Sequence, residues 1–183
     1  MKSSILHFCK SMALLSAFTM LFTVSVSAQQ SPGAKDSVAI NGKNIVVKYS
    51  SPSVRGRDIF SATGLLSKDG TYPIWRAGAN AATLFHTDAD LMIGALHVPK
   101  GDYSLYVNVQ NPDNWELVIN KQTGQGGTTY KPEMDLGRVK MNMSKPSAIV
   151  ESLYYKITPT GANNGTIRLA WENRIGEVNF MVH

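Results

Sequence analysis

Residues with recognisable chemistry cluster in the stretch PIWRAGANAATLF, which runs from Pro73 to Phe85. Arg76 carries a planar fork of donors that suits a carboxylate or a row of carbonyl oxygens. Asn80 can close a turn through a hydrogen bond to its own backbone. Trp75 adds an aromatic ring just before a predicted strand. Such residues could form a ligand site, or they could brace a loop.

The bracing interpretation requires a structural partner for Arg76. Charged side chains are rarely buried unless they are paired, and Asp58 lies in the long segment that precedes this stretch. We therefore favour a brace from Arg76 to Asp58, with Asn80 closing the turn. The alternative is a site in which Arg55, Arg57 and Arg76 converge on an anionic or carbonyl-rich ligand.

His86 is a second residue with chemistry of its own, because Asp88 follows two residues later on the same strand face. A zinc site needs three or four His, Cys or carboxylate ligands. The histidines beyond the N-terminal apolar run, which are His86, His97 and His183, form no H-x-H or H-E-x-x-H motif. Serine catalysis needs a base and an orienting carboxylate, and no G-x-S-x-G motif occurs. The sequence therefore predicts no metal, no cofactor and no catalytic set.

A small secreted hydrolase is nevertheless the alternative function. It would use His86 and acidic residues on one sheet face, and convergence of His86 with two carboxylates within about 3 Å would favour it. The acids available for such a face are Asp88, Asp102, Glu116, Asp135, Glu151 and Glu172. Any β-sandwich of this size carries several acids, so a binding or scaffolding module without catalysis is the primary hypothesis.

A binding module would hold a glycan, a peptide or a protein with aromatic rings and bidentate polar groups. The pattern places Tyr72, Trp75, Tyr106 and Tyr130 in loops or on polar faces, whereas Trp115 and Trp171 fall on apolar positions and are predicted in the core. The predicted ligand-binding residues are Arg55, Arg57, Trp75, Arg76, Asn80 and His86. Assembly through an exposed sheet edge is a third alternative.

The elements that must position these residues are strands. Apolar and polar residues alternate with period two from about residue 37, which indicates strands with one buried face. About ten short strands separated by turn signals predict one antiparallel β-sandwich, jelly-roll-like, over residues 37–183. Asn-Gly at 41–42 predicts a two-residue hairpin. The irregular connection 49–75 is the exception, and loops of that length are often functional.

The N-terminus predicts export. Residues 1–28 combine a charged start, an apolar run and the small residues VSA, which is the pattern of a cleaved signal peptide. The apolar run is shorter than the roughly 20 residues of a spanning helix. We therefore expect no stable membrane anchor after cleavage and a location in the periplasm or outside the cell. Residues 29–36 would form a short flexible N-terminus.

Cleavage also changes the composition of the chain. Loss of Lys2 and Lys10 from the 18 basic residues, against 13 acidic ones, lowers the formal net charge from +5 to +3. Cys9, the only cysteine, is lost as well, so no disulfide is expected. Nucleic-acid binding calls for a clustered basic surface with stacking aromatics. The basic residues here are scattered, and we expect no nucleic-acid partner.

Four blocks of the sequence, in order, carry a family resemblance: YSSPSVRGRDIF, IWRAGANAAT, VPKGDYSLYV and NWELVINK. They resemble the successive blocks of the bacterial domain-of-unknown-function family 2911, and the resemblance runs from about Ser37 to Trp171. It implies an exported, all-β protein and assigns no activity.

The chain also departs from that family pattern. Ala81 stands where an acidic residue usually follows Gly-Ala-Asn, so a family site that used this carboxylate would be altered here. SATGLLSKDGTYP replaces a shorter connection between Phe60 and Trp75. The tract from Gly124 to Tyr130 lacks an expected Trp.

Overall fold

The computed structural model describes residues 30–183, and the predicted signal peptide lies outside that range. The chain forms an antiparallel β-sandwich, as predicted, with 13 strands in place of about ten. The strands are β1 (Gly33–Ile40), β2 (Lys43–Ser50), β3 (Ile74–Trp75), β4 (Thr83–Thr87), β5 (Leu91–Ile93), β6 (Leu96–Val98), β7 (Gly101–Asn108), β8 (Glu116–Asn120), β9 (Asp135–Lys140), β10 (Asn142–Ser144), β11 (Val150–Pro159), β12 (Asn164–Glu172) and β13 (Arg174–Val182). Two short 3-10 turns complete the described elements: η1 (Leu66–Lys68) and η2 (Pro132–Met134).

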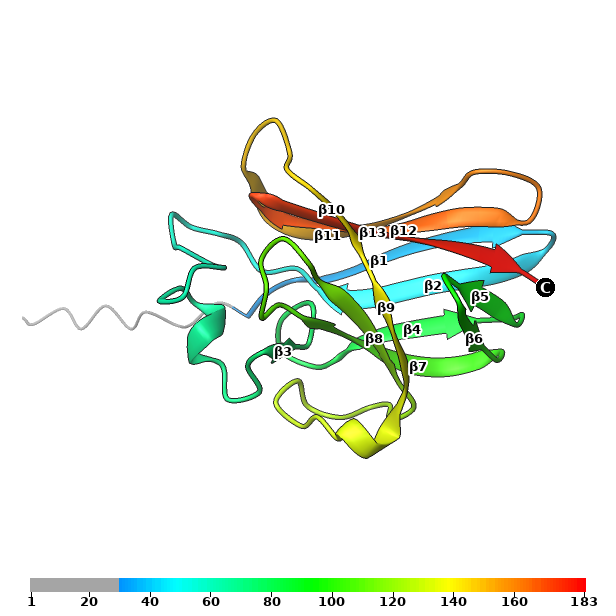
Figure 1. Ribbon diagram of the computed structural model, residues 1–183, viewed down its shortest axis with the longest axis horizontal. Helices are drawn as coiled ribbons and strands as arrows, with labels where there is room; N and C mark the ends of the chain where they lie inside the picture. Colours follow the sequence, from blue (N-terminus) through cyan, green and yellow to red (C-terminus); the bar gives the residue numbers. More distant parts are fainter. Residues whose placement is uncertain (1–29) are drawn as a thin grey trace, which may run out of the picture.

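The strands build two sheets, which Figure 1 shows as two layers. The first sheet has the order β1-β2-β4-β7-β8-β9, with β3 paired to β7. The second has the order β11-β12-β13-β5-β6, with β10 paired to β13. The chain crosses between the sheets from β4 to β5, from β6 to β7 and from β9 to β10. Short connections join β1 to β2 and β7 to β8 in the first sheet, and β5 to β6, β11 to β12 and β12 to β13 in the second, whereas β2–β4, β4–β7 and β5–β13 pair strands that are distant in the chain.

The predicted hairpin at 41–42 is confirmed. Asn41 and Gly42 have φ angles of 50° and 71°, the two positive values that a type I′ turn requires. The strand before this turn begins at Gly33, which pairs with Ser50. Residues 33–36 are therefore strand, and the prediction that they belong to a flexible N-terminus over residues 29–36 was wrong. The reason is that β2 continues to Ser50 and supplies β1 with a partner along its whole length.

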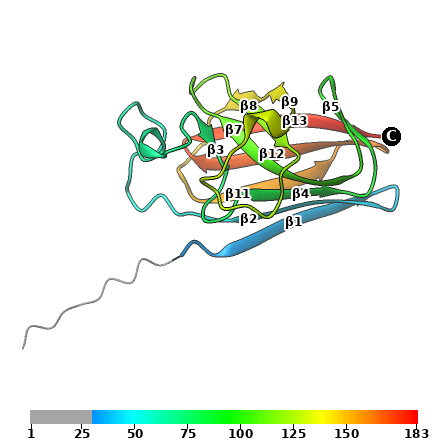
Figure 2. The ribbon, with the colours of Figure 1, turned by 90° about the horizontal axis from the view of Figure 1, so that it is seen from below.

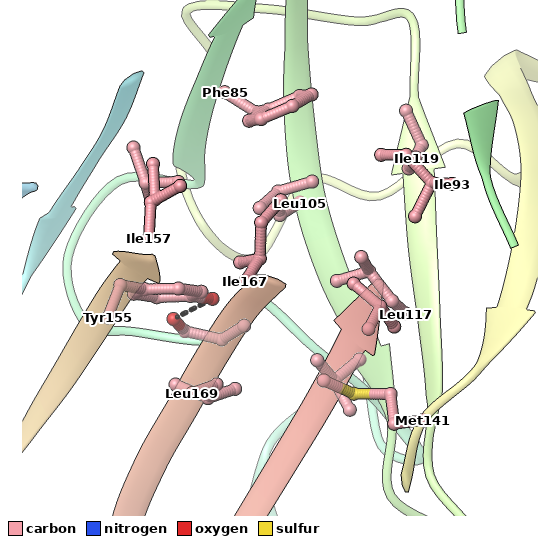
Figure 3. Close-up of a cluster of buried hydrophobic side chains, with 14 of the residues drawn as sticks. Phe85, Ile93, Leu105, Leu117, Ile119, Met141, Tyr155, Ile157, Ile167 and Leu169 are labelled. Atoms are coloured by element: carbon pink, nitrogen blue, oxygen red, sulfur yellow. Dashed lines mark hydrogen bonds between the residues drawn. The ribbon is translucent and has the colours of Figure 1, made fainter. Parts of the chain in front are cut away.

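Alternate residues of the two sheets fill one core between them (Figure 3). Phe85 and Leu105 point into it from the first sheet, and Ile157 and Ile167 point into it from the second. Full burial of an aliphatic or phenyl side chain stabilises the fold by roughly 1.5–3 kcal/mol. These residues lie on the apolar positions of the period-two alternation, so the alternation correctly predicted which face of each strand is buried.

The core ends in an aromatic cluster. Trp115 and Trp171 are buried, as predicted, and Phe60 from the long connection packs on both, with ring centroids 4.9 and 5.9 Å away. Trp75 is buried as well and stacks on Trp171 at 5.6 Å. Trp75 is thus a core residue and not an exposed binding platform.

We call residues 51–73 the excursion. Figures 1 and 2 both place it at the end of the sandwich opposite the C-terminus. It is irregular but not loose, because Val54, Ile59 and Leu66 insert into the core. Within residues 30–183, no helix is long and apolar enough to cross a membrane. The excursion leads into β3 and so fixes the entrance to the stretch around Arg76.

Candidate functional site

The stretch from Trp75 to Asn80 is a tight turn held from several sides. The carbonyl oxygen of Ala77 accepts hydrogen bonds from the Thr83 hydroxyl and from the buried Tyr155 hydroxyl, each at 3.0 Å. The Trp75 indole donates to the carbonyl of Gly78 at 3.1 Å. Ala77 has a φ of 50°, a conformation that non-glycine residues adopt only where their surroundings hold it. The turn is therefore rigid.

Arg76 forms the predicted brace, but with a different partner. Its Nη2 lies 2.5 Å from Oδ2 of Asp69, and only 17% of the Arg76 side chain and 12% of the Asp69 side chain are exposed. Asp58, the partner we expected, instead accepts hydrogen bonds from the backbone and hydroxyl of Ser61 within its own turn. The prediction of Asp58 was wrong because this local turn already uses its carboxylate.

The Asp69 carboxylate is held in its charged form. Burial raises its pKa, but hydrogen bonds from the backbone and hydroxyl of Thr71 and from Arg76 outweigh burial and lower the pKa below its usual range. A charged acid that is partly buried and paired in this way fastens the excursion to the turn. Asp69 belongs to the segment SATGLLSKDGTYP, so the segment that departs from the family pattern supplies the partner of Arg76.

Asn80 joins three parts of the chain. Its Nδ2 donates to the carbonyl of Ser31 at 3.1 Å and to the hydroxyl of Ser50 at 3.2 Å. Its carbonyl accepts from the backbone N–H of Gly127 at 3.1 Å. A Cβ at Gly127 would lie 2.2 Å from Cδ of Arg76, so only glycine permits this approach. The glycine-rich loop therefore packs directly on the brace.

A hollow of about 350 Å³ opens beside the brace, and we call it the cationic hollow. Four of the predicted binding residues line it: Arg57, Trp75, Arg76 and Asn80. Lys68, which we did not predict, adds another cation. Pockets of this size are typical of small-molecule sites. The fold thus brings together four of the six residues that the sequence predicted to bind a ligand.

Arg57 and Arg55 line a smaller hollow of about 100 Å³ that shares Ser31 with the cationic hollow. Arg57 donates from Nε to the carbonyl of Val54 at 2.9 Å and from Nη2 to that of Ser53 at 2.5 Å. These bonds fix the direction of its guanidinium. Arg55 lies next to the cationic hollow but does not line it.

His86 is separate from the other predicted site residues. Its Nδ1 lies 2.8 Å from Oδ1 of Asp102 across the sheet, and its Nε2 lies 3.0 Å from Oδ1 of Asp88. The hydrogen bond to Asp88, and then that to Asp102, raise the pKa of His86. The distances from His86 to two carboxylates therefore meet the criterion that we set for a hydrolase.

The chemistry of that cluster does not fit catalysis. Both ring nitrogens of His86 face carboxylates, which favours the protonated ring and leaves neither nitrogen turned toward a substrate. Asp88 also accepts two hydrogen bonds from Asn44. Within the described part of the chain, no group of three or more His, Cys, Asp or Glu is arranged to hold a metal ion. The cluster links three neighbouring strands on an exposed face.

The remaining aromatic candidates differ in exposure. Tyr106 is buried, and Tyr130 packs on it with ring centroids 4.9 Å apart beneath the glycine-rich loop. Burial, together with the hydrogen bond to Asp135, raises the pKa of Tyr130 to about 12. Among the four predicted platform residues, Tyr72 is the exposed one, with 43% of its surface accessible.

Among the comparisons with known proteins, only the match to a family model gives a result. A family model described as "Protein of unknown function (DUF2911)" matches residues 31–180, which is most of the chain and agrees with the resemblance seen in the sequence blocks. No curated protein matches the chain. No solved structure matches it either.

Proposed function

The chain belongs to the DUF2911 family, and we propose that it is an exported, non-catalytic binding module whose ligand carries a carboxylate or phosphate group. The ligand would occupy the cationic hollow at the end of the sandwich. The observation that carries this proposal is the charge of that hollow, which has Arg57, Lys68 and Arg76 in its lining against the single acid Asp69.

The charges of the hollow are not balanced from within. Asp69 is paired with Arg76. In the part of the chain that the structure describes, neither Arg57 nor Lys68 forms an ion pair. Arg57 is oriented through two backbone carbonyls, so its remaining donors have no carboxylate to bind. An anionic group is the ligand that this lining leaves room for.

The hollow is also partly apolar. Trp75 and Trp171 form part of its wall, and Leu65 lies on it with 37% of its surface exposed. Binding sites for small molecules combine such apolar walls with a few placed polar groups. We therefore expect an anion with an apolar body to bind more tightly than a bare inorganic ion.

The brace serves this function by fixing the geometry of the site. Arg76 is held by Asp69 on one side and approached by Gly127 on the other, so it loses little conformational freedom when a ligand binds. Preorganised donors bind more tightly because the entropy cost of ordering them has been met during folding. The two interpretations of the stretch around Arg76, brace and site, are compatible in this arrangement.

Thermal unfolding with a panel of anions tests the proposal. The probes are inorganic phosphate, citrate, glucuronate and an acidic tripeptide, added to the purified protein at low ionic strength. A ligand at 100 times its dissociation constant stabilises by about 2.7 kcal/mol, which raises Tm by roughly 5–10 °C for a domain of this size. We expect at least one probe to give such a shift and added salt to reduce it.

Charge-matched variants locate the binding. Arg57→Gln with Lys68→Gln removes two cations from the hollow and should abolish the shift. Lys121→Gln with Lys140→Gln removes two exposed cations elsewhere and should leave it unchanged. A shift that survives in the first variant, or no shift with any probe, contradicts the proposed site.

Export is tested separately by the mass of the mature protein. Cleavage after Ala28 leaves a chain that begins at Gln29. We expect this N-terminus in protein recovered from the periplasm or the medium of the producing cell. An intact Met1 in that fraction would contradict cleavage.

A further inference from the structure

A second hollow of about 320 Å³ lies at the same end of the sandwich. Three separate segments line it: the excursion with Asp58, Phe60 and Tyr72, the connection from β7 to β8 with Gln110, and the turn between β12 and β13 with Glu172. We call it the mixed hollow, because its lining carries groups of both charge signs. Its residues are distinct from those of the cationic hollow.

The walls of the mixed hollow are fixed in place. Arg174 donates from Nε to the carbonyl of Pro112 at 3.1 Å and from Nη1 to Oδ1 of Asn173 at 3.0 Å, and only 15% of its side chain is exposed. It thereby ties the connection between β7 and β8 to the turn between β12 and β13. Phe60, packed on the tryptophan cluster, supplies an apolar surface. The hollow is preformed.

Tyr72 is unusual on this rim. The residue is 43% exposed, and its side chain makes no hydrogen bond and no ring contact within residues 30–183. Exposed aromatic rings without partners, when they border a hollow, are common in binding sites because they supply a large, rigid contact surface. Tyr72 therefore offers exposed aromatic surface to a ligand.

Glu172 is held in a conformation that costs energy. Glu172 and Asn173 form the two-residue turn between the paired residues Trp171 and Arg174, and only Glu172 has a positive φ, of 52°. This is the pattern of a type II′ turn, whose first central position is usually glycine. A non-glycine residue there is strained, and such strain is concentrated at functional positions. The strain places a carboxylate at the hollow.

The polar groups that line the mixed hollow indicate which class of ligand it could bind. Asp58 accepts from Ser61 and Glu172 accepts from the backbone N–H of Asn173, but each carboxylate has further lone pairs that can accept a hydrogen bond. Arg174 can donate, and Gln110 can do both, with no partner for its side chain in the described structure. A protonated amine offers only donors, a quaternary ammonium group offers none, and an ionised carboxylate or phosphate offers only acceptors, whereas a hydroxyl group offers both. We propose that the mixed hollow binds a neutral saccharide, with a sugar ring stacked on Tyr72 and its hydroxyls bonded to Asp58, Gln110 and Glu172.

Calorimetric titration with defined sugars tests this site. The probes are maltotriose, cellotriose and triacetylchitotriose, with choline as a cationic and citrate as an anionic comparison. We expect at least one trisaccharide to bind with a Kd below about 10 mM. The Arg57→Gln, Lys68→Gln variant should bind that sugar as the unmodified protein does, so the outcome is independent of the anion site.

Variants of the rim distinguish a site from adventitious contact. Tyr72→Ala should raise the Kd at least about tenfold, which corresponds to 1.4 kcal/mol, and Tyr72→Phe should preserve binding. Tyr154→Ala, which removes another exposed tyrosine on β11, should have no effect. Glu172→Gly should raise Tm while it weakens sugar binding, a combination that a purely structural role for Glu172 does not produce.

Three results would overturn the inference. The first is the absence of binding by all three sugars at concentrations on the order of 10 mM. The second is sugar binding that Tyr72→Ala leaves unchanged in a protein that still folds. The third is tighter binding of choline or citrate than of any sugar at the mixed hollow, which would assign it to a charged ligand.

Discussion

Two clusters in this protein each pair a basic side chain with aspartate, but their surroundings differ. Arg76 and Asp69 pair at the end of the sandwich, mostly buried, beside a hollow. His86, Asp88 and Asp102 meet on the outer face of the first sheet, where 36% of the His86 side chain and more of each acid are exposed. Both clusters have short contacts, but only the first borders a hollow with unpaired cations.

The difference follows from the backbone beneath each cluster. On a regular sheet, side chains of neighbouring strands stand side by side and satisfy one another, as His86 and Asp102 do across β4 and β7. The irregular excursion instead folds back on the sandwich and leaves space between its turns. A pair of charges is therefore a poor indicator of a site unless the backbone around it also leaves room for a ligand.

The largest loss of stability should come from a substitution in the aromatic cluster, which supports the turn around Arg76. Trp75→Ala removes a ring that stacks on Trp171 and donates to Gly78, and we expect a loss of about 3–5 kcal/mol in the free energy of unfolding. Urea denaturation followed by circular dichroism measures it. A loss below about 1 kcal/mol would mean that the end of the sandwich is not part of the cooperative core.

The brace should show the next largest effect. Hydrogen bonds to charged groups contribute about 1.5–3 kcal/mol when little water reaches them. A double-mutant cycle with Arg76→Ala and Asp69→Ala should give a coupling energy in this range. The same cycle with His86→Ala and Asp102→Ala should give a clearly smaller one, because exposed pairs are screened by solvent. Equal coupling energies would remove the contrast between the two regions.

A pair of glycines sharpens the role of the glycine-rich loop. A Cβ at Gly127 would lie 2.2 Å from Cδ of Arg76 and 2.4 Å from the carbonyl oxygen of Asn80. Gly127→Ala should therefore lower stability by about 1–3 kcal/mol. Gly126→Ala is the matched control, because nothing lies within 4 Å of its Cβ position. If the two variants are equally stable, the loop does not pack on the brace in solution.

The smallest effect should be the pH dependence of the exposed cluster. Hydrogen bonds to Asp88 and Asp102 raise the pKa of His86, so protonated His86 stabilises the fold at pH values below its unfolded pKa of about 6.5. That contribution is lost as the pH rises through the folded pKa. Wild type should therefore exceed His86→Gln in stability by more at about pH 5.5 than at about pH 8.5. A difference that does not vary with pH would show that folding does not raise the pKa of His86.

The sequence was informative where local rules decide the structure. The alternation predicted the two-layered core, Asn41 and Gly42 predicted their turn, and the apolar positions of Trp115 and Trp171 predicted burial. All of these depend on residues adjacent in the chain or on the side of a strand that they face.

The candidate site was harder to predict because its contacts are made between distant segments. Local spacing could not distinguish Asp58 from Asp69 as the partner of Arg76, since the choice depends on how the excursion folds. Lys68 gave no signal of its own, and the buried position of Trp75 follows from its stack on Trp171. One available signal was the segment SATGLLSKDGTYP, whose departure from the family pattern contains both Lys68 and Asp69.

Chemical-shift mapping tests the contrast between the two regions most directly. The 15N-labelled protein is titrated with the anion that gives the largest thermal shift, and backbone amide signals are followed for the whole described chain. Signals of Lys68, Arg76 and Asn80 around the cationic hollow should move in proportion to occupancy, while those of His86 and Asp102 should not. Movement centred on His86, or no saturable movement anywhere, would contradict the account.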